Sequence, residues 1–169
     1  VELRNRLSQE ISLFDLNIPE NTWRIRGGID LDFPTDVRIP ALGRLIITEL
    51  EPDAYRSKYI IPETVIIVGP YSGKLDKNGE SIRLLRPDPP VGAPDPDAGF
   101  VPYLHVDEVQ YDNELPWPRE ADGLGAGLQR IHLASDGSDS DNWSSFRPGL
   151  GTEGDLDEDG MLDAWETMF

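Results

Sequence analysis

The residues whose types and spacing best suit chemistry lie in DLDEDGMLDAWE, the stretch from Asp155 to Glu166. Its acids and its glycine follow the pattern D-x-D-x-D-G-x5-E, in which Gly160 permits the sharp turn that a short ion-binding loop needs. Ca²⁺ takes about six to eight oxygen ligands, and a loop with oxygen atoms at alternate positions can surround the ion. The sequence therefore predicts a calcium site whose ligands are the side chains of Asp155, Asp157, Asp159, Asp163 and Glu166 and the backbone carbonyl of Met161.

A solvated acidic tail is the alternative interpretation of this stretch, because runs of charge are usually solvated. The regular spacing favours the site, and MLDAWE supplies the apolar beginning of an exiting helix. The segment GLGTEG before Asp155 cannot form an entering helix, and in this the loop resembles calcium repeats of the thrombospondin type 3 and dockerin kinds. Such repeats occur in series, so we expect a single loop to bind calcium weakly, at about 10⁻⁴ to 10⁻³ M. That affinity suits an extracellular setting.

Four other groups of reactive residues have simpler structural explanations. Asp136–Asn142 lacks the spacing of a metal loop and is rich in loop formers. His105 and His132 lie in predicted strands with neither a cysteine nor a second histidine nearby. Gly123–Gly127 lacks the Lys-Ser/Thr pair of a phosphate loop. The neighbours in Asp107–Glu108 must point to opposite faces of a strand. We therefore expect no catalytic residues and no enzyme.

The composition is that of an acidic chain of 169 residues, with 32 acidic and 15 basic residues and a net charge of -17. A charge of this sign repels phosphate backbones and anionic lipid surfaces, so nucleic acid is not an expected partner. No apolar run approaches the roughly 20 residues of a membrane helix, so we expect no membrane insertion. Cysteine is absent, which removes disulfides and thiolate metal sites. The chain starts at Val1 without an initiator methionine, and we expect it to be a fragment.

Short apolar or alternating runs between turn signals dominate the chain, among them TWRI, RLIIT, TVIIV, SIRLL and LHVDEVQY. Runs of this length rich in β-branched and aromatic residues predict strands, and many of them with little helix predict an all-β sandwich or barrel. The one predicted helix is Pro52–Tyr59, with proline in its first turn. Residues 87–102 hold six of the fifteen prolines and predict a projecting loop. Residues 151–169 are expected to be a Gly-rich linker followed by the calcium loop.

Three aromatic residues are candidates for ligand binding. Trp117 lies between two prolines, Trp143 follows an acidic loop, and Tyr103 follows the Pro-rich segment. Exposed aromatic rings can form a platform for sugar rings or peptides. The alternative is that large aromatic side chains close the ends of a sandwich core.

Several motifs resemble, in order along residues 1–150, the lamin tail domain found in large secreted bacterial proteins. The most specific are GPYSGKLDKNGESIRL and VDEVQYDNELPWP, and the others include FPTDVRIPALGRLIIT and DNWSSFRPGLG. The resemblance implies an immunoglobulin-like β-sandwich and no catalytic residues. It also implies an accessory or interaction module attached to other domains at the cell surface.

These observations predict an all-β, immunoglobulin-like β-sandwich with a short C-terminal calcium-loop extension. The expected function is that of a non-catalytic interaction or adhesion module in a larger secreted or cell-surface protein, where calcium stiffens the connection to the next domain. Its expected partners are the calcium ion, neighbouring domains of the same polypeptide, and a protein or glycan of unknown identity. An accessory substrate- or glycan-binding module of an extracellular hydrolase is the alternative.

Overall fold

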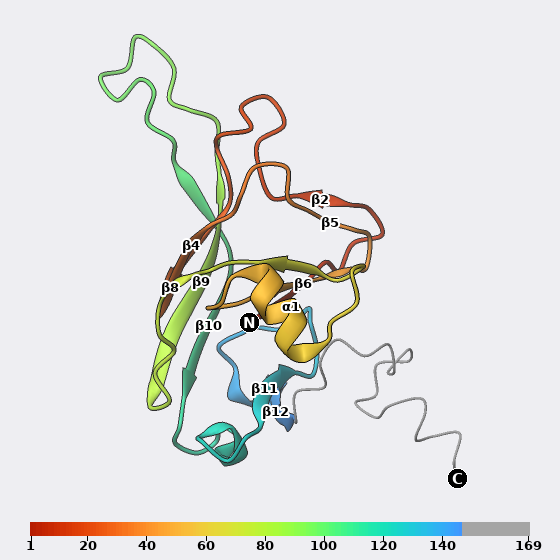
Figure 1. Ribbon diagram of the computed structural model, residues 1–169. Coiled ribbons are helices and arrows are strands. Elements are labelled where there is room, and N and C mark those ends of the chain that lie inside the picture. The colour runs from red at the N-terminus through yellow and green to blue at the C-terminus, as the bar shows by residue number, and fades with distance from the viewer. Residues whose placement is uncertain (147–169) are drawn as a thin grey trace.

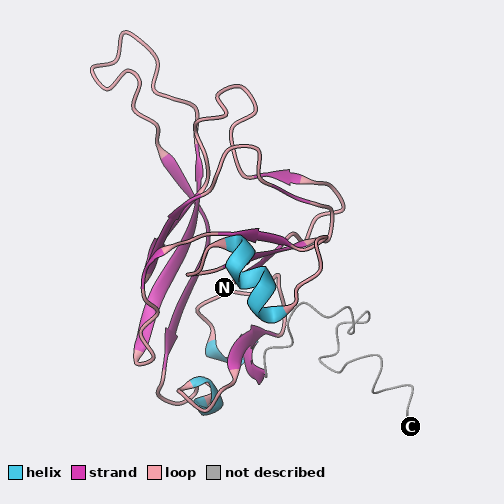
Figure 2. Ribbon diagram, in the orientation of Figure 1, coloured by secondary structure: helices cyan, strands magenta, loops and turns pink. Residues whose placement is uncertain are grey.

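The computed structural model describes residues 1–146, which form mostly short strands with one α-helix and two 3₁₀ turns (Figures 1 and 2). The predicted all-β class is confirmed. The elements are β1 (Glu2–Arg4), β2 (Ile11–Ser12), β3 (Arg24–Gly27), β4 (Ile29–Asp32), β5 (Arg38–Ile39), β6 (Arg44–Ile47), α1 (Pro52–Tyr59), β7 (Ile66–Val68), β8 (Ser72–Gly73), β9 (Gly79–Pro87), β10 (Tyr103–Asp112), η1 (Arg119–Ala121), β11 (Gly127–Arg130), η2 (Ser140–Asn142) and β12 (Trp143–Phe146).

The largest sheet has five antiparallel strands in the order β10-β9-β3-β4-β8. The alternation of side chains in β4 shows how it is oriented, since Ile29 and Leu31 are buried while Asp30 and Asp32 are exposed. Successive strand residues point to opposite faces, so one face of this sheet lies on the core and the other faces solvent. β10 is an edge strand of this sheet.

A second sheet has the order β1-β6-β7, and its β6–β7 pair is parallel. Parallel neighbours need a crossover connection, and α1 lies within the segment that joins them. The predicted bounds of this helix, Pro52–Tyr59, are confirmed, with proline at its N-terminus as expected. Beyond the helix, the Arg56 side chain donates hydrogen bonds to the carbonyls of Ile61, Pro62 and Val65. Arg56 therefore stabilises the conformation of the segment that connects α1 to β7.

The α-helix ends at Ile60 in a left-handed conformation, with φ of 54° and ψ of 47°. A positive φ is rare for a β-branched residue, because its side chain then crowds the backbone. The Ile60 side chain is 89% exposed, whereas the next residue, Ile61, is 5% exposed. The strained turn thus directs Ile61 inward and leaves Ile60 in solvent.

One hydrophobic core joins the two larger sheets and the small β2–β5 pair. Ile25 and Ile29 contribute from the five-stranded sheet, Leu45 and Ile47 from β6, and Ile39 from β5. These five side chains are all at most 3% exposed. The burial of these side chains removes apolar surface from water and is the main force that holds the sheets together.

β9 and β10 form a long hairpin whose connection, residues 88–102, projects from one end of the molecule (Figure 1). The predicted loop at 87–102 is confirmed, except that Pro87 is the last residue of β9. The pairing of His105 with Leu85 and of Asp107 with Leu84 leaves Val106 without a partner, so β10 contains a β-bulge. None of the helices in residues 1–146 is long and apolar enough to cross a membrane.

Candidate functional site

The predicted calcium ligands Asp155, Asp157, Asp159, Met161, Asp163 and Glu166 lie outside the described residues. The candidate site that the structure describes is an aromatic pair beside the β11–β12 hairpin. Trp117 follows β10, and Trp143 begins β12. Their ring centroids lie 6.0 Å apart with an interplanar angle of 41°, a favourable geometry for two aromatic rings. The structure thus brings together two of the three predicted aromatic residues.

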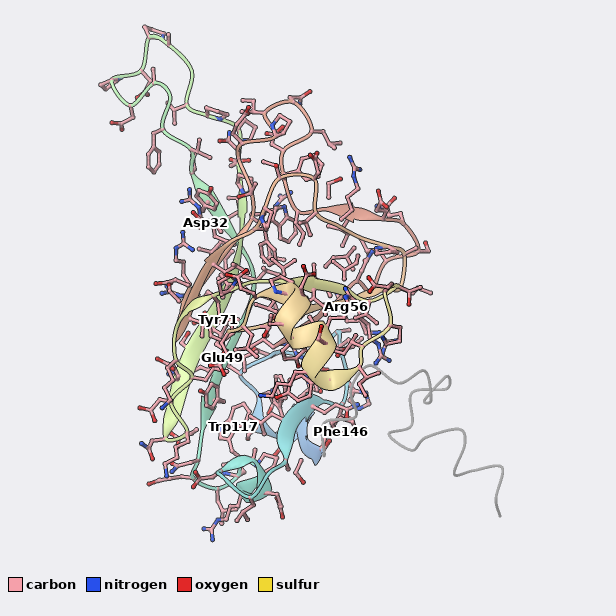
Figure 3. All side chains as sticks on the ribbon, in the orientation of Figure 1. Asp32, Glu49, Arg56, Tyr71, Trp117 and Phe146 are labelled. Atoms are coloured by element: carbon pink, nitrogen blue, oxygen red, sulfur yellow. The ribbon has the colours of Figure 1, made fainter. Side chains whose placement is uncertain are left out.

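Trp117 is 7% exposed, so its ring offers little surface to a ligand. Its burial corresponds to the alternative prediction, in which a large aromatic side chain packs at the end of a core. Figure 3 shows Trp117 at the end of the molecule that carries β11 and β12. Trp143 is only partly buried. Of the pair, Trp143 is therefore the ring that can contact a ligand.

The orientation of Trp143 is fixed by contacts on its edge and its face. Its indole Nε1 donates a hydrogen bond of 2.8 Å to the carbonyl of Gly137. The Arg130 guanidinium lies over its ring, with Cζ 5.3 Å from the ring centroid. Arg130 in turn donates to both carboxylate oxygens of Asp107, at 2.8 and 3.2 Å. A bidentate pair of this kind restrains the guanidinium, and it also brings a fixed positive charge to one face of the indole.

Asn142 holds the loop that leads into Trp143. It is 4% exposed, its Oδ1 accepts from the His132 amide at 2.8 Å, and its Nδ2 donates to the carbonyls of His132 and Asp136. A second contact ties this loop to β10, where the Gln110 amide donates to Ser138 Oγ at 3.1 Å. The loop expected at 136–142 is thus present as a set of turns around the buried Asn142 amide, and its acids Asp136, Asp139 and Asp141 are exposed.

Tyr103 lies apart from the tryptophan pair, at the other end of β10. Its ring stacks against the Arg24 guanidinium, which lies 4.0 Å from the centroid, and Arg24 also pairs with Asp32. Asp32 marks this end of the sheet in Figure 3, far from Trp117 in the same view. Nine residue steps of strand correspond to about 30 Å, so the three aromatic side chains cannot form one platform.

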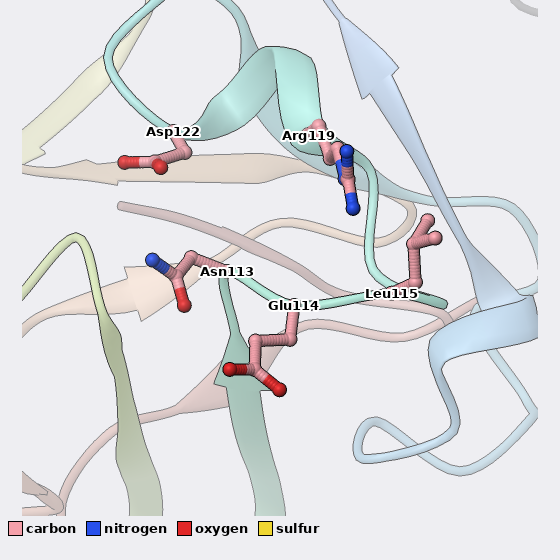
Figure 4. Close-up of a pocket in the computed structure, with 5 residues that line it drawn as sticks. All are labelled: Asn113, Glu114, Leu115, Arg119 and Asp122. Carbon is pink, nitrogen blue, oxygen red and sulfur yellow. The ribbon is translucent and has the colours of Figure 1, made fainter.

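An open hollow lies between the end of β10 and η1 (Figure 4). It is lined by side chains of mixed charge, namely Asn113, Glu114, Leu115, Arg119 and Asp122. Leu115 is 69% exposed there. The lining combines one guanidinium with two carboxylates, so its charged groups are of both signs.

The single histidine of β10, His105, and the acids of this strand do not form a catalytic arrangement, and His132 lies two residues after the end of β11, not in a strand as expected. Ser81 Oγ donates to Glu108 Oε1 at 2.5 Å, and His105 Nε2 lies 3.2 Å from Glu108 Oε2. The Ser81 hydrogen bond, together with His105, lowers the pKa of the Glu108 carboxyl. A carboxylate with a lowered pKa is a weak base. The Glu108 carboxylate also lies between the Ser81 hydroxyl and the His105 imidazole, whereas a nucleophilic triad requires the imidazole between the hydroxyl and the carboxylate.

Tyr111 also has a shifted pKa. Burial raises the pKa of Tyr111 to about 12, and Glu80 and Asp76 contribute to the shift. Its hydroxyl donates a 2.7 Å hydrogen bond to the Asp76 carbonyl and so remains protonated at ordinary pH. Residues 1–146 contain no group of three or more His, Cys, Asp or Glu side chains placed to hold a metal ion.

Sequence reasoning missed Arg130, Gly137 and Asn142. No local pattern marks them, because their partners lie on other segments of the chain. Comparisons of the chain with family models, with curated proteins and with solved structures found no match. The resemblance to the lamin tail domain therefore remains a prediction from the motifs in the sequence.

Proposed function

We propose that the chain is a non-catalytic interaction module of a larger secreted or cell-surface protein, in which a calcium-binding loop stiffens the connection to the next domain. The observation that carries this proposal is the ligand spacing of Asp155–Glu166, which begins nine residues after Phe146, the last residue of β12. A loop of this pattern binds calcium through carboxylate and carbonyl oxygens. In the proposed role, calcium neutralises the carboxylates and fixes the direction in which the chain leaves the domain.

Two structural features support an immunoglobulin-like sandwich of the lamin tail kind. Side chains from the five-stranded sheet and from the β1-β6-β7 sheet share one core, as the two layers of a sandwich do. The two most specific sequence motifs also meet in space. Tyr111, from VDEVQYDNELPWP, donates its hydroxyl hydrogen to the carbonyl of Asp76, from GPYSGKLDKNGESIRL.

Isothermal titration calorimetry of the 169-residue chain with calcium tests the calcium loop. We expect one saturable site with a dissociation constant of about 10⁻⁴ to 10⁻³ M. Asp157→Ala and Glu166→Gln each remove a predicted ligand and should abolish the heat of binding. Glu158→Gln is the matched control, because Glu158 occupies a non-ligand position of the loop and its loss should leave binding unchanged. Equal titrations for all three variants, or no heat from the unchanged chain, would refute the proposed role of calcium.

Glycan binding is a second candidate function, and the position of Trp143 favours it. The residue is partly exposed, its indole contacts Arg130 and Gly137, and the Trp117 ring centroid lies 6.0 Å away. A pre-oriented aromatic ring can stack on the apolar face of a sugar. A glycan array probed with the unchanged chain and with Trp143→Ala tests this function, and Tyr103→Ala is a control from the other end of β10. A signal that survives in Trp143→Ala, or no signal from the unchanged chain, excludes it.

A further inference from the structure

Two loops project from the same end of the molecule, opposite the end that carries β11 and β12 (Figure 1). One is the β9–β10 connection, residues 88–102, called the arm below. The other is the loop of residues 15–21, called the short loop. Their bases are tied together by the Tyr103 hydroxyl, which donates a 3.2 Å hydrogen bond to the carbonyl of Thr22. The two loops thus rise from one connected base.

The arm is held in shape by its own backbone. Val91 and Phe100 close it, since the Val91 amide donates to the Phe100 carbonyl at 2.8 Å and the Gly99 amide donates to the Val91 carbonyl at 2.8 Å. Asp95 turns its tip by accepting the Ala98 amide on its carbonyl and the Asp97 amide on its carboxylate. The prolines of the arm restrict the backbone further. An ordered loop loses less entropy on binding than a flexible one.

The short loop is also built by internal hydrogen bonds. The Asp15 carboxylate accepts the amides of Asn17 and Ile18 at 2.7 and 3.2 Å, and the Asp15 amide donates to the Asn21 carbonyl at 2.9 Å. This turn leaves Leu16 69% exposed and Ile18 36% exposed. On the arm, Phe100 is 63% exposed. Each loop therefore presents apolar side chains on a fixed backbone.

The charged side chains on the two loops themselves are all negative. The short loop carries Asp15 and Glu20, and the arm carries Asp88, Asp95 and Asp97. Neither loop contains a lysine, an arginine or a histidine. Apolar side chains surrounded by carboxylates are complementary to a surface in which basic side chains flank apolar ones.

We propose that the arm and the short loop form a docking end for a protein segment in which lysine or arginine residues alternate with large apolar residues. Phe100 and Leu16 supply apolar contacts, and the five carboxylates attract the basic residues around them. This inference rests on the proposed function in that it names the partner class of the interaction module. It does not depend on calcium, so it can fail or succeed independently of the titration above.

Fluorescence anisotropy with labelled synthetic peptides tests this proposal, using the 169-residue chain in buffer containing a calcium chelator. The probe alternates lysine and leucine; one reference peptide alternates lysine and serine, and another alternates glutamate and leucine. We expect the lysine–leucine peptide to bind most tightly, because it matches both the charge and the apolar contacts. Phe100→Ser should weaken that binding roughly tenfold, as expected for an aromatic contact residue. Leu124→Ser is the matched control, since Leu124 is 76% exposed on another loop.

The charge contribution is tested with Asp95→Asn and Asp97→Asn together. The asparagine oxygen at position 95 retains the acceptor that turns the arm, so the variant removes charge and keeps the fold. Asp136→Asn and Asp139→Asn together remove the same charge from the other end of the molecule. Weaker binding for the arm variant alone supports the proposal. Three results would overturn the proposal: equal weakening by both charge variants, equal weakening by Phe100→Ser and Leu124→Ser, or no binding of the lysine–leucine peptide. In each case the calcium titration still tests the calcium loop independently.

Discussion

Replacement of Ile60 by glycine is expected to stabilise the protein. Ile60 ends α1 with φ of 54°, a backbone conformation that an L side chain disfavours. The Ile60 side chain is 89% exposed, so its removal forfeits little buried apolar surface. Glycine has no Cβ and adopts this conformation without steric cost, which is why it is the usual residue at such helix ends.

The size of the effect follows from two opposing terms. The left-handed conformation costs an L-residue roughly 1–2 kcal/mol, and glycine relieves that cost. Glycine also gives the unfolded chain more conformational freedom, which lowers the free energy of unfolding by about 0.5–1 kcal/mol. The net gain in the free energy of unfolding is therefore about 0.5–1 kcal/mol. In a protein of this size that corresponds to a rise in melting temperature of roughly 1–4 °C.

Thermal unfolding followed by circular dichroism measures this shift. Leu16→Gly is the matched control, because Leu16 is 69% exposed and does not have a positive φ. It should leave the melting temperature unchanged or lower it slightly. If Ile60→Gly also leaves the melting temperature unchanged, or lowers it as the control does, then the strain assigned to Ile60 does not exist.

Three further changes test other parts of the structure. Arg56→Lys removes most of the donors that hold the α1–β7 connection and should lower the free energy of unfolding by about 2 kcal/mol in urea titrations, since each lost hydrogen bond costs about 1 kcal/mol. Asn142→Ala leaves buried polar partners unpaired and should cost about 2–4 kcal/mol in the same assay. Ser81→Ala removes the main cause of the lowered pKa of Glu108, so an NMR titration should show that pKa rising. A carboxyl group whose pKa is lowered by folding stabilises the folded state at pH values above its unfolded pKa. This stabilisation is lost as the pH falls through the folded pKa, so the Ser81→Ala variant should lose less stability on acidification than the unchanged chain.

The sequence predicted those features that are decided by neighbouring residues. Pro52–Tyr59 is a helix because proline suits its first turn, and the prolines of 87–102 prevent that segment from continuing a sheet. Strand positions followed from β-branched and apolar runs such as RLIIT. These signals are local, and each stays visible in a short window of the chain.

The sequence could not predict contacts between distant segments. Arg130 and Asp107 are 23 residues apart, and no pattern in either neighbourhood indicates that they pair. Strict alternation along LHVDEVQY puts Leu104, Val106 and Glu108 on one face and His105, Asp107, Val109 and Tyr111 on the other, so neither face is purely apolar. The bulge at Val106 breaks that alternation. Because of the extra residue, the side chains after the bulge point to the opposite face from the one that strict alternation predicts. His105 and Glu108 therefore share a face, and His105 Nε2 lies 3.2 Å from Glu108 Oε2. A pattern that assumes unbroken alternation places them on opposite faces.

The bulge has a second consequence, because β10 is a ten-residue strand at the edge of its sheet. A long regular edge is a template on which strands of other molecules can add, and it promotes aggregation. In β10 the bulge interrupts the regular spacing of backbone groups near Val106. Farther along β10, the Gln110 amide donates its hydrogen bond to Ser138 Oγ and so is not free to pair with another strand. Gly137 packs closely against the Glu108 carbonyl, because a Cβ added to Gly137 would lie 2.2 Å from that oxygen. The loop that orients Trp143 thus also shields the sheet from edge-to-edge association, so shortening it would be expected to cost the protein its resistance to aggregation.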